Sequence, residues 1–326
     1  MRSYFVYILA RTVIFCIRIL PRPVGIFIIR IFASTAYFLD FRHRHIAAVN
    51  LKIAFPYLPD AQRAGIARRS FQNIALNLLE ISRLRLLNPE NIASLVDYDS
   101  AKGLDNFRSA QSEGKGILYM TGHFSAWELL PAAHALYGHP LSFVTRPLDN
   151  VIFDRYLQLL RESVGNRVIN KKNALRPILK CLKENGSVGI LMDQNTSLNE
   201  GIFADLFGLP AATTTGIVLL ALRTGAPILP GYLTPMHRGR YTIKFLPPVK
   251  VIRTGDRDRD IEINTLMLNR ILEGIIREQP ESWLWGHKRW KYQPPEISRD
   301  IYGLSKEELN RFLESRRNAR QGKESV

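Results

Sequence analysis

The chain has 326 residues, which is enough to bury a substantial core in one large domain or two modest ones. Apolar residues make up 46% of it and no low-complexity tract appears, so intrinsic disorder is excluded for the body of the chain. Lysine and arginine number 45 against 29 acidic residues, and a net charge of +16 favours anionic partners such as phospholipid surfaces, phosphorylated substrates, acidic carrier proteins or nucleic acid.

The N-terminal segment carries two apolar runs, 4–20 and 24–39, with five arginines and no acid before Asp40. Both runs are shorter than the roughly 20 apolar residues of a membrane span, and Arg11 and Arg18 would share one helix face. This pattern favours helices that lie in, or dip into, the headgroup layer of an anionic membrane. Two alternatives stay open: a cleaved signal peptide and a pair of buried helices in a soluble protein.

Further along the chain, apolar spacing predicts helices between 42 and 85, and strand patterns then alternate with helix patterns. We predict strands at 114–120, 141–146, 187–193, 226–233 and 240–251, with helices after Ser125 and at 153–165, 174–186, 213–225 and 260–280. The stretch between 193 and 213 is interpreted as a long, turn-rich loop. The alternation predicts an α/β fold with a largely parallel central sheet flanked by helices, preceded by an N-terminal membrane-associated helical segment.

These patterns divide the chain into four parts. They are anchor or interfacial helices at 1–39, a helical lead-in at 40–98, an α/β domain at 99–298 and a charged, peripheral tail at 299–326. We expect deletion of 1–39 to release the protein from membranes and to leave the α/β domain folded. Cys16 and Cys181 have no CxxC or Cys/His neighbourhood, so neither a disulfide framework nor a zinc site is expected, and a reducing cytosolic environment fits.

Three polar side chains follow predicted strands: His123, Arg146 and Asp193. Because functional sites of open α/β sheets gather at the carboxyl ends of the strands, these residues are expected at the same edge. A base, a cation and a carboxylate that end three apolar runs indicate a site more strongly than any one of them alone.

The stretch GHFSAWE, at 122–128, allows two interpretations of Glu128. In the first, Ser125 and Glu128 form a capping box at the start of a helix. In the second, Glu128 holds one tautomer of His123, whose imidazole removes a proton from a hydroxyl. No GxSxG nucleophile elbow accompanies the histidine, so an acyl-enzyme has no visible nucleophile.

The H-x4-E pattern from His123 to Glu128 resembles the signature of glycerolipid and lipid A acyltransferases. The chain is similar in particular to the late lipid A acyltransferases, in the stretches TGHFSAWEL, TRPLDN, RYLQLLRESVG, ILMDQN, GIFADLFGLPAATTTG and PESWLWGHKRWK. The resemblance implies direct transfer of a fatty acyl chain from acyl carrier protein to a hydroxyl, with His123 as general base oriented by Glu128. It implies substrate-binding roles for Arg146, Arg161 and Asp193, with the part played by Asp193 left open, and it implies no metal and no cofactor.

The same resemblance implies a phosphorylated glycolipid acceptor, a lipid A precursor or a related glycolipid, and contact with anionic membrane lipid. It places the protein at the bacterial inner membrane with its catalytic domain facing the cytoplasm. One alternative is a lysophospholipid acyltransferase that uses acyl-CoA. That branch carries a glutamate-glycine motif at the position where this chain has LMDQNT, which argues against the alternative. Another is a non-catalytic basic scaffold on the membrane. No recognisable nucleic-acid-binding module is present, so no nucleic acid partner is expected.

Overall fold

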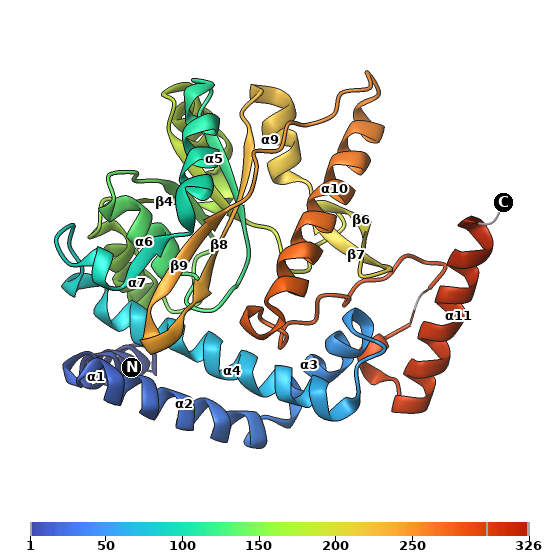
Figure 1. Cartoon of the computed structure of the whole chain (residues 1–326), viewed down its shortest axis with the longest axis horizontal. Coiled ribbons are helices and arrows are strands. Elements are labelled where there is room, and N and C mark those ends of the chain that lie inside the picture. Colours follow the sequence, from blue (N-terminus) through green and yellow to red (C-terminus); the bar gives the residue numbers. More distant parts are fainter. Residues whose placement is uncertain (1, 298, 325–326) are drawn as a thin grey trace.

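A seven-stranded sheet forms the centre of the molecule, in the order β1-β9-β8-β2-β5-β3-β4, and a separate two-stranded sheet joins β6 to β7 (Figure 1). The computed structural model describes residues 2–297 and 299–324. The neighbours in the central sheet are parallel except for β8 and β9, which confirms the predicted α/β fold with a mostly parallel sheet. The strands are β1 Val96–Tyr98, β2 Ile117–Thr121, β3 Ser142–Thr145, β4 Arg167–Asn170, β5 Ser187–Leu191, β6 Gly201–Leu206, β7 Leu209–Thr214, β8 Ile228–Pro235 and β9 Tyr241–Phe245.

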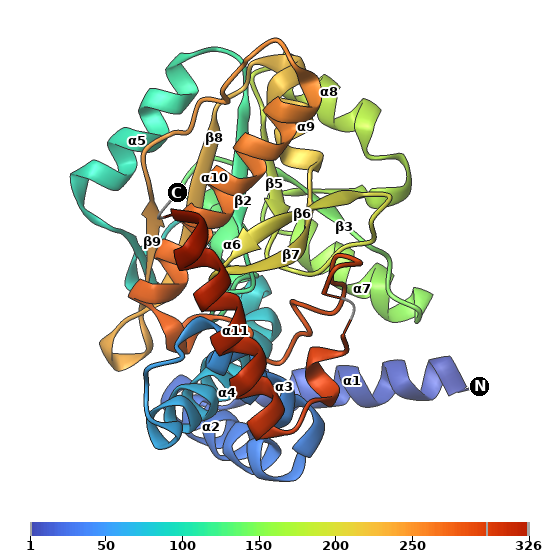
Figure 2. The same ribbon diagram turned by 90° about the vertical axis from the view of Figure 1, so that its right-hand side faces the viewer.

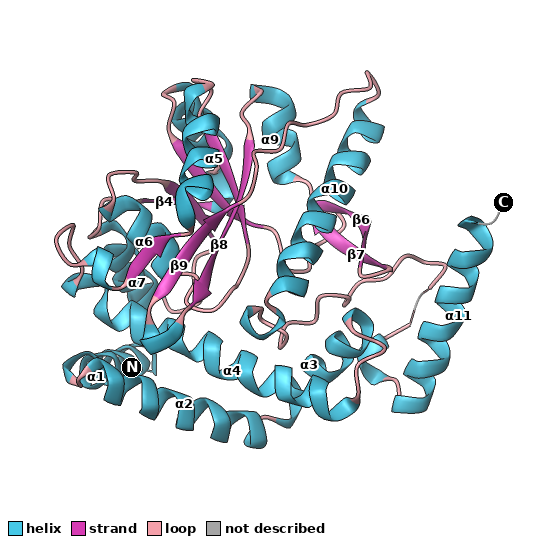
Figure 3. Ribbon diagram, viewed as in Figure 1, coloured by secondary structure: helices cyan, strands magenta, loops and turns pink. Residues whose placement is uncertain are grey.

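Helices cover both faces of this sheet (Figure 3). In β2, Ile117 and Tyr119 join the core cluster under α5, α6 and α7, whereas Leu118 and Met120 join the cluster under α8, α9 and α10, because successive side chains of a strand point to opposite faces. Burial on both faces explains why β2 is apolar at four successive positions. The helices are α1 Arg2–Ile19, α2 Arg22–Leu39, α3 Phe41–Ala54, α4 Asp60–Arg83, α5 Ser100–Ser112, α6 Leu129–Leu136, α7 Val151–Glu162, α8 Leu175–Lys183, α9 Gly216–Thr224, α10 Arg257–Glu278 and α11 Lys306–Glu324.

The interpretation of 193–213 as a turn-rich loop is wrong for the second half of the segment, which forms the β6–β7 hairpin. Phe207 and Gly208 make its two-residue turn, both with positive φ, and Gly208 N–H donates to Asp205 Oδ1. Two positive φ angles are what a tight hairpin turn requires, but a phenylalanine at the first of them gives no recognisable turn signal. Because β7 takes Thr213 and Thr214, α9 begins three residues later than predicted.

The first four helices form the base of the molecule, with α2 running along α4 (Figure 1). The two helices approach so closely that a Cβ on Gly25 would lie 2.9 Å from Leu79 Cδ1. Arg22 Nη2 donates to Oε1 of the buried Glu80 at 2.6 Å. At the N-terminal end, α1 lies against α7, where the Arg11 guanidinium covers the Tyr156 ring at 5.0 Å (Figure 2). The N-terminal helices are therefore packed on the rest of the protein.

The C-terminal tail is a helix with an apolar face. Leu309, Phe312 and Leu313 of α11 are buried in the larger core cluster, although the sequence around them is dominated by charged residues. This part of the tail is thus integrated into the core, contrary to the peripheral tail expected from its charge.

Candidate active site

The site begins with three neighbouring strands, β2, β5 and β3, which are parallel and adjacent in that order. His123 lies two residues after β2, Asp193 two residues after β5, and Arg146 directly after β3. Since the strands run in the same direction, all three residues emerge at one edge of the sheet, as the strand ends predicted.

The half-buried His123 and the buried Asp193 form a pair at this edge. The imidazole Nδ1 lies 2.9 Å from Asp193 Oδ1, and the backbone N–H of His123 donates to Asp193 Oδ2 at 2.8 Å. The indole N–H of Trp283 donates to the same Oδ2 at 2.9 Å. Three polar contacts therefore hold a carboxylate whose residue is only 2% exposed.

The charges of the pair stabilise each other. Burial alone would raise the pKa of Asp193, but the His123 imidazole and the donated hydrogen bonds outweigh it and lower that pKa to about 2. Burial alone would lower the pKa of His123, but the Asp193 carboxylate outweighs it, so the pKa of the imidazole is raised. An ionised Asp193 fixes the proton of neutral His123 on Nδ1 and leaves the lone pair on Nε2.

The close approach of β2 and β5 depends on the glycine before the histidine. A Cβ at Gly122 would lie 2.9 Å from the Asp193 carboxyl carbon and 2.9 Å from the Phe124 ring. Any side chain here would push Asp193 away from His123, which gives the glycine of GHFSAWE a physical role that the sequence alone did not show.

The outer nitrogen of His123, Nε2, is not in contact with Asp193. Gln194 Nε2 lies 3.4 Å from His123 Nε2, and the Trp127 ring meets the imidazole edge to face at 5.0 Å between centroids. The histidine side chain keeps 19% of its surface exposed. A hydroxyl that reached Nε2 could give up its proton there, which is the geometry of a general base.

Glu128 occupies the N-cap position of α6, but its side chain makes no capping hydrogen bond, and it is not the direct partner of His123. Its carboxylate is held in a fork by Arg161 of α7, with Nε to Oε2 at 2.9 Å and Nη2 to Oε1 at 2.5 Å. The capping box is wrong: Ser125 has a φ of 50°, its Oγ makes no hydrogen bond within the described part of the chain, and α6 begins only at Leu129. The strained backbone at Ser125 breaks the helical path that a capping box needs.

The Glu128–Arg161 pair lies close enough to influence the histidine. Glu128 contributes to the raised pKa of His123 through its charge. Burial alone would lower the pKa of Arg161, but the hydrogen bond and charge of Glu128 raise it, so this cation stays charged. Asn77 of α4 accepts from the backbone N–H of Glu128 at 3.1 Å and ties the pair to the base of the molecule.

Arg146 is exposed and lies outside the buried network. The hydrogen bond that Lys171 Nζ donates to Glu200 at 2.7 Å lowers the pKa of Glu200, and the charge of Arg146 adds to this effect. Arg146 is therefore placed at the rim of the site, on the same edge as His123.

The segment 283–290 supplies side chains that sequence reasoning did not assign to the site. Trp283 binds Asp193, and its backbone pairs with Phe124 beside His123. Trp283, Trp285 and Trp290 are buried and belong to the core. The signal was the motif PESWLWGHKRWK, but a single sequence does not show which of its residues turn inward.

Comparison with known proteins finds similarity over most of the chain. A family model described as bacterial lipid A biosynthesis acyltransferase matches residues 1–292. The chain is 27% identical over 255 residues to a lipid A biosynthesis lauroyltransferase of Escherichia coli, covering 78% of this chain and 80% of that protein. It is 27% identical over 280 residues to a palmitoleoyltransferase of the same pathway and organism, covering 84% and 87%. An acyltransferase from Haemophilus influenzae is 22% identical over 249 residues, covering 75% and 74%.

Proposed function

Because the chain belongs to the bacterial lipid A biosynthesis acyltransferases and is an O-acyltransferase, we propose that it moves a fatty acyl chain from acyl carrier protein directly to a hydroxyl of a lipid A precursor. The observation that carries this proposal is the His123–Asp193 pair, in which Nδ1 is held at 2.9 Å, Nε2 is left for a substrate proton, and the histidine side chain is 19% exposed. No covalent enzyme intermediate is invoked, because the attacking group is the acceptor hydroxyl itself.

In the proposed reaction, His123 Nε2 takes the proton from the acceptor hydroxyl as its oxygen attacks the thioester carbonyl carbon. Asp193 stabilises the imidazolium that forms, since its carboxylate already lies on Nδ1. The tetrahedral oxyanion then collapses, the carbon–sulfur bond breaks, and the imidazolium returns its proton to the leaving thiolate. The products are the ester and the free thiol of the carrier.

We assign Glu128 and Arg161 a joint role beside this dyad. The forked ion pair fixes both side chains, and Arg161 Nη1 makes no hydrogen bond to the described residues, so it is free to meet an anionic or carbonyl oxygen of substrate. Glu128 acts on His123 through its charge. Arg146, exposed at the rim, suits the phosphate of a glycolipid acceptor.

We also propose that the protein lies on the cytoplasmic side of the inner membrane through its base. Among the described residues, α2 alone is long and apolar enough to cross a bilayer, and it lies along α4 with part of its surface buried. Both N-terminal helices expose large apolar side chains, such as Phe15, Phe27 and Phe32, next to arginines. Apolar side chains beside cations suit an in-plane position at an anionic surface.

The test is a transfer assay with purified protein in detergent or vesicles. Acyl carrier protein and acyl-CoA carrying the same chain are offered as donors, with a lipid A precursor and a lysophospholipid as acceptors. The proposal expects the carrier protein and lipid A precursor pair to be preferred, and His123→Ala to abolish transfer. Preference for acyl-CoA with the lysophospholipid would instead support a glycerolipid acyltransferase.

A further inference from the structure

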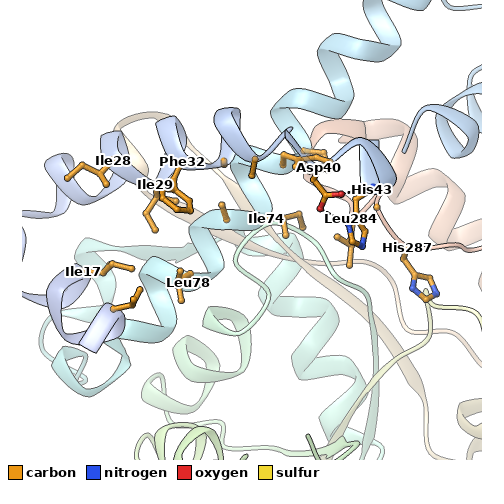
Figure 4. Close-up of a pocket in the computed structure, with 17 residues that line it drawn as sticks. Ile17, Ile28, Ile29, Phe32, Asp40, His43, Ile74, Leu78, Leu284 and His287 are labelled. Carbon is orange, nitrogen blue, oxygen red and sulfur yellow. Dashed lines mark hydrogen bonds and ion pairs between the residues drawn. The ribbon is translucent and has the colours of Figure 1, made fainter. Parts of the chain in front are cut away.

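An apolar cavity of about 640 Å³ lies between the N-terminal helices and the segment that pairs with the catalytic histidine (Figure 4). Ile29 and Phe32 of α2 line one side of it, and Ile74 and Leu78 of α4 line the other. Its volume falls within the roughly 300–1,000 Å³ typical of ligand sites, and its walls are mostly aliphatic. The proposed reaction step at His123 does not itself use this cavity.

The cavity opens on the base of the molecule. Four of the apolar side chains that line it are also exposed at the surface: Val13, Ile28, Phe32 and Leu78. Phe27 and Ile31, one helical turn apart on α2, extend the same exposed apolar surface. A chain that enters here would therefore come from the apolar layer against which the N-terminal helices rest.

One end of the cavity, which Asp40 and His43 also line, borders the segment that pairs with Phe124. Leu284 lines the cavity, and its backbone N–H donates to the carbonyl oxygen of His123 at 3.1 Å. His287 lines the same end, and its Nε2 accepts from the backbone N–H of Asn195 at 3.0 Å. Burial lowers the pKa of His287 to about 4, so its imidazole is neutral and presents no charge to an apolar ligand.

We propose that this cavity holds an acyl chain already attached to the acceptor lipid, which enters from the bilayer between α1, α2 and α4. The inference rests on the proposed function, but it concerns a different part of the substrate from the reacting groups. The chain on a soluble carrier protein arrives from the aqueous side, whereas the mouth of the cavity lies among exposed apolar side chains of the base. Anchoring one acceptor chain here would bring its headgroup hydroxyl to the edge that carries His123.

The first test narrows the cavity from opposite walls with Ala75→Phe on α4 and Ala36→Phe on α2. Ala61→Phe, on an exposed position of α4 outside the cavity, is the matched control. We expect the KM for a lipid A precursor with full-length chains to rise about tenfold or more in either cavity variant, because the burial of several methylenes is lost. The donor chain-length preference and the KM for an acceptor with shortened chains should stay close to wild type.

A second test identifies the molecule in the cavity by photo-crosslinking and does not require enzymatic turnover. One arm uses a lipid A precursor with a diazirine at the end of one acyl chain, in phosphatidylethanolamine and phosphatidylglycerol vesicles. The other arm uses acyl carrier protein loaded with a diazirine fatty acid. Labelling of α2 and α4 by the acceptor probe, lost in Ala75→Phe and kept in Ala61→Phe, supports the inference even if no transfer to the precursor is observed.

Two results would overturn it. Labelling of the cavity by the donor probe, or a shift of donor preference to shorter chains with the acceptor KM unchanged, would mean that the cavity holds the transferred chain. No labelling by either probe in an active enzyme would mean that the cavity takes no substrate chain, while leaving the proposed function intact.

Discussion

Two regions of the molecule bury a carboxylate beside a basic side chain, with opposite electrostatic results. At the catalytic edge, Asp193 receives contacts on both oxygens, and its pKa falls to about 2. In the base, Oε1 of Glu80 accepts hydrogen bonds from both Arg22 and the Tyr241 hydroxyl, whereas Oε2 has no partner among the described residues. Burial dominates there and raises the pKa of Glu80.

The difference shows that a neighbouring cation does not by itself keep a buried acid ionised. Each oxygen removed from water must recover its lost hydrogen bonds, and a carboxylate with one bare oxygen still carries most of the desolvation penalty. Asp193 is arranged to stay charged, as the proposed role of His123 as a general base requires. Glu80 serves the packing of α2 on α4, where permanent ionisation is not needed.

The largest effect is expected from deletion of residues 2–39. It removes Arg22 from Glu80 and uncovers Leu76 and Leu79 of α4, which pack against Ile29. Leaving the buried Glu80 carboxyl without the Arg22 donor costs about 1–3 kcal/mol, and the lost apolar burial adds to it. Contrary to the expectation from the sequence, we expect the truncated chain not to fold, as measured by circular dichroism and thermal unfolding. A soluble, cooperatively unfolding truncation would show that the base is a detachable anchor.

Asp193→Asn should have the next largest effect, now on catalysis. The amide cannot stabilise the imidazolium, so we expect kcat to fall by about 10³–10⁴-fold. The base form of His123 is neutral, and its pKa is raised, so wild-type activity should rise with pH through a midpoint above the ordinary histidine value. In the variant, the midpoint of the residual activity should move to lower pH. An unchanged pH profile would remove Asp193 from the dyad.

Glu128→Gln tests the contribution of Glu128 separately from that of Asp193. Glutamine can keep one hydrogen bond to Arg161 but not the charged fork, so we expect kcat to fall by about 10²-fold or more. The free energy of unfolding should fall by about 1.5–3 kcal/mol as the charged hydrogen bonds weaken. Introduced into His123→Ala, the same Glu128→Gln change should cost little further activity. Loss of stability with wild-type transfer kinetics would make the Glu128–Arg161 pair purely structural.

Arg146→Lys tests the rim of the catalytic edge. A lysine keeps the charge but not the planar fork, so we expect transfer to fall by about tenfold to a hundredfold, mainly through the KM for a phosphorylated acceptor. Because Arg146 is exposed, the melting temperature should not change. Equal kinetics for phosphorylated and dephosphorylated acceptors in both proteins would show that Arg146 does not read phosphate.

The smallest effect on activity is expected from Glu80→Gln. A raised pKa means that the folded state holds the proton more tightly than the unfolded state, so the wild type loses stability as pH rises through that pKa. The glutamine variant lacks this loss, and its stability relative to wild type should improve from acidic to neutral pH while kcat stays unchanged. A variant that is less stable by the same amount at every pH would show that Glu80 is ionised in the folded protein.

Much of the catalytic edge could be predicted from the sequence. His123, Arg146 and Asp193 each end an apolar run, and the alternation of strands with helices was sufficient to predict a parallel sheet with these residues at one edge. Local pattern is enough for such predictions because burial on both faces dictates which residues a central strand can contain.

Only the tertiary structure decided which of these groups meet. The order β2-β5-β3 places Asp193 beside His123, although the two residues are 70 positions apart in the sequence. The packing of α7 brings Arg161 into an ion pair with Glu128, 33 positions away. The short spacing from His123 to Glu128 indicated a direct pair. In the structure, the chain turns at Ser125 with a positive φ, and the Glu128 carboxylate is held by Arg161 instead of contacting His123. Sequence spacing governs contacts within one helix or strand, whereas contacts between elements follow from how their apolar faces pack, which no local pattern records.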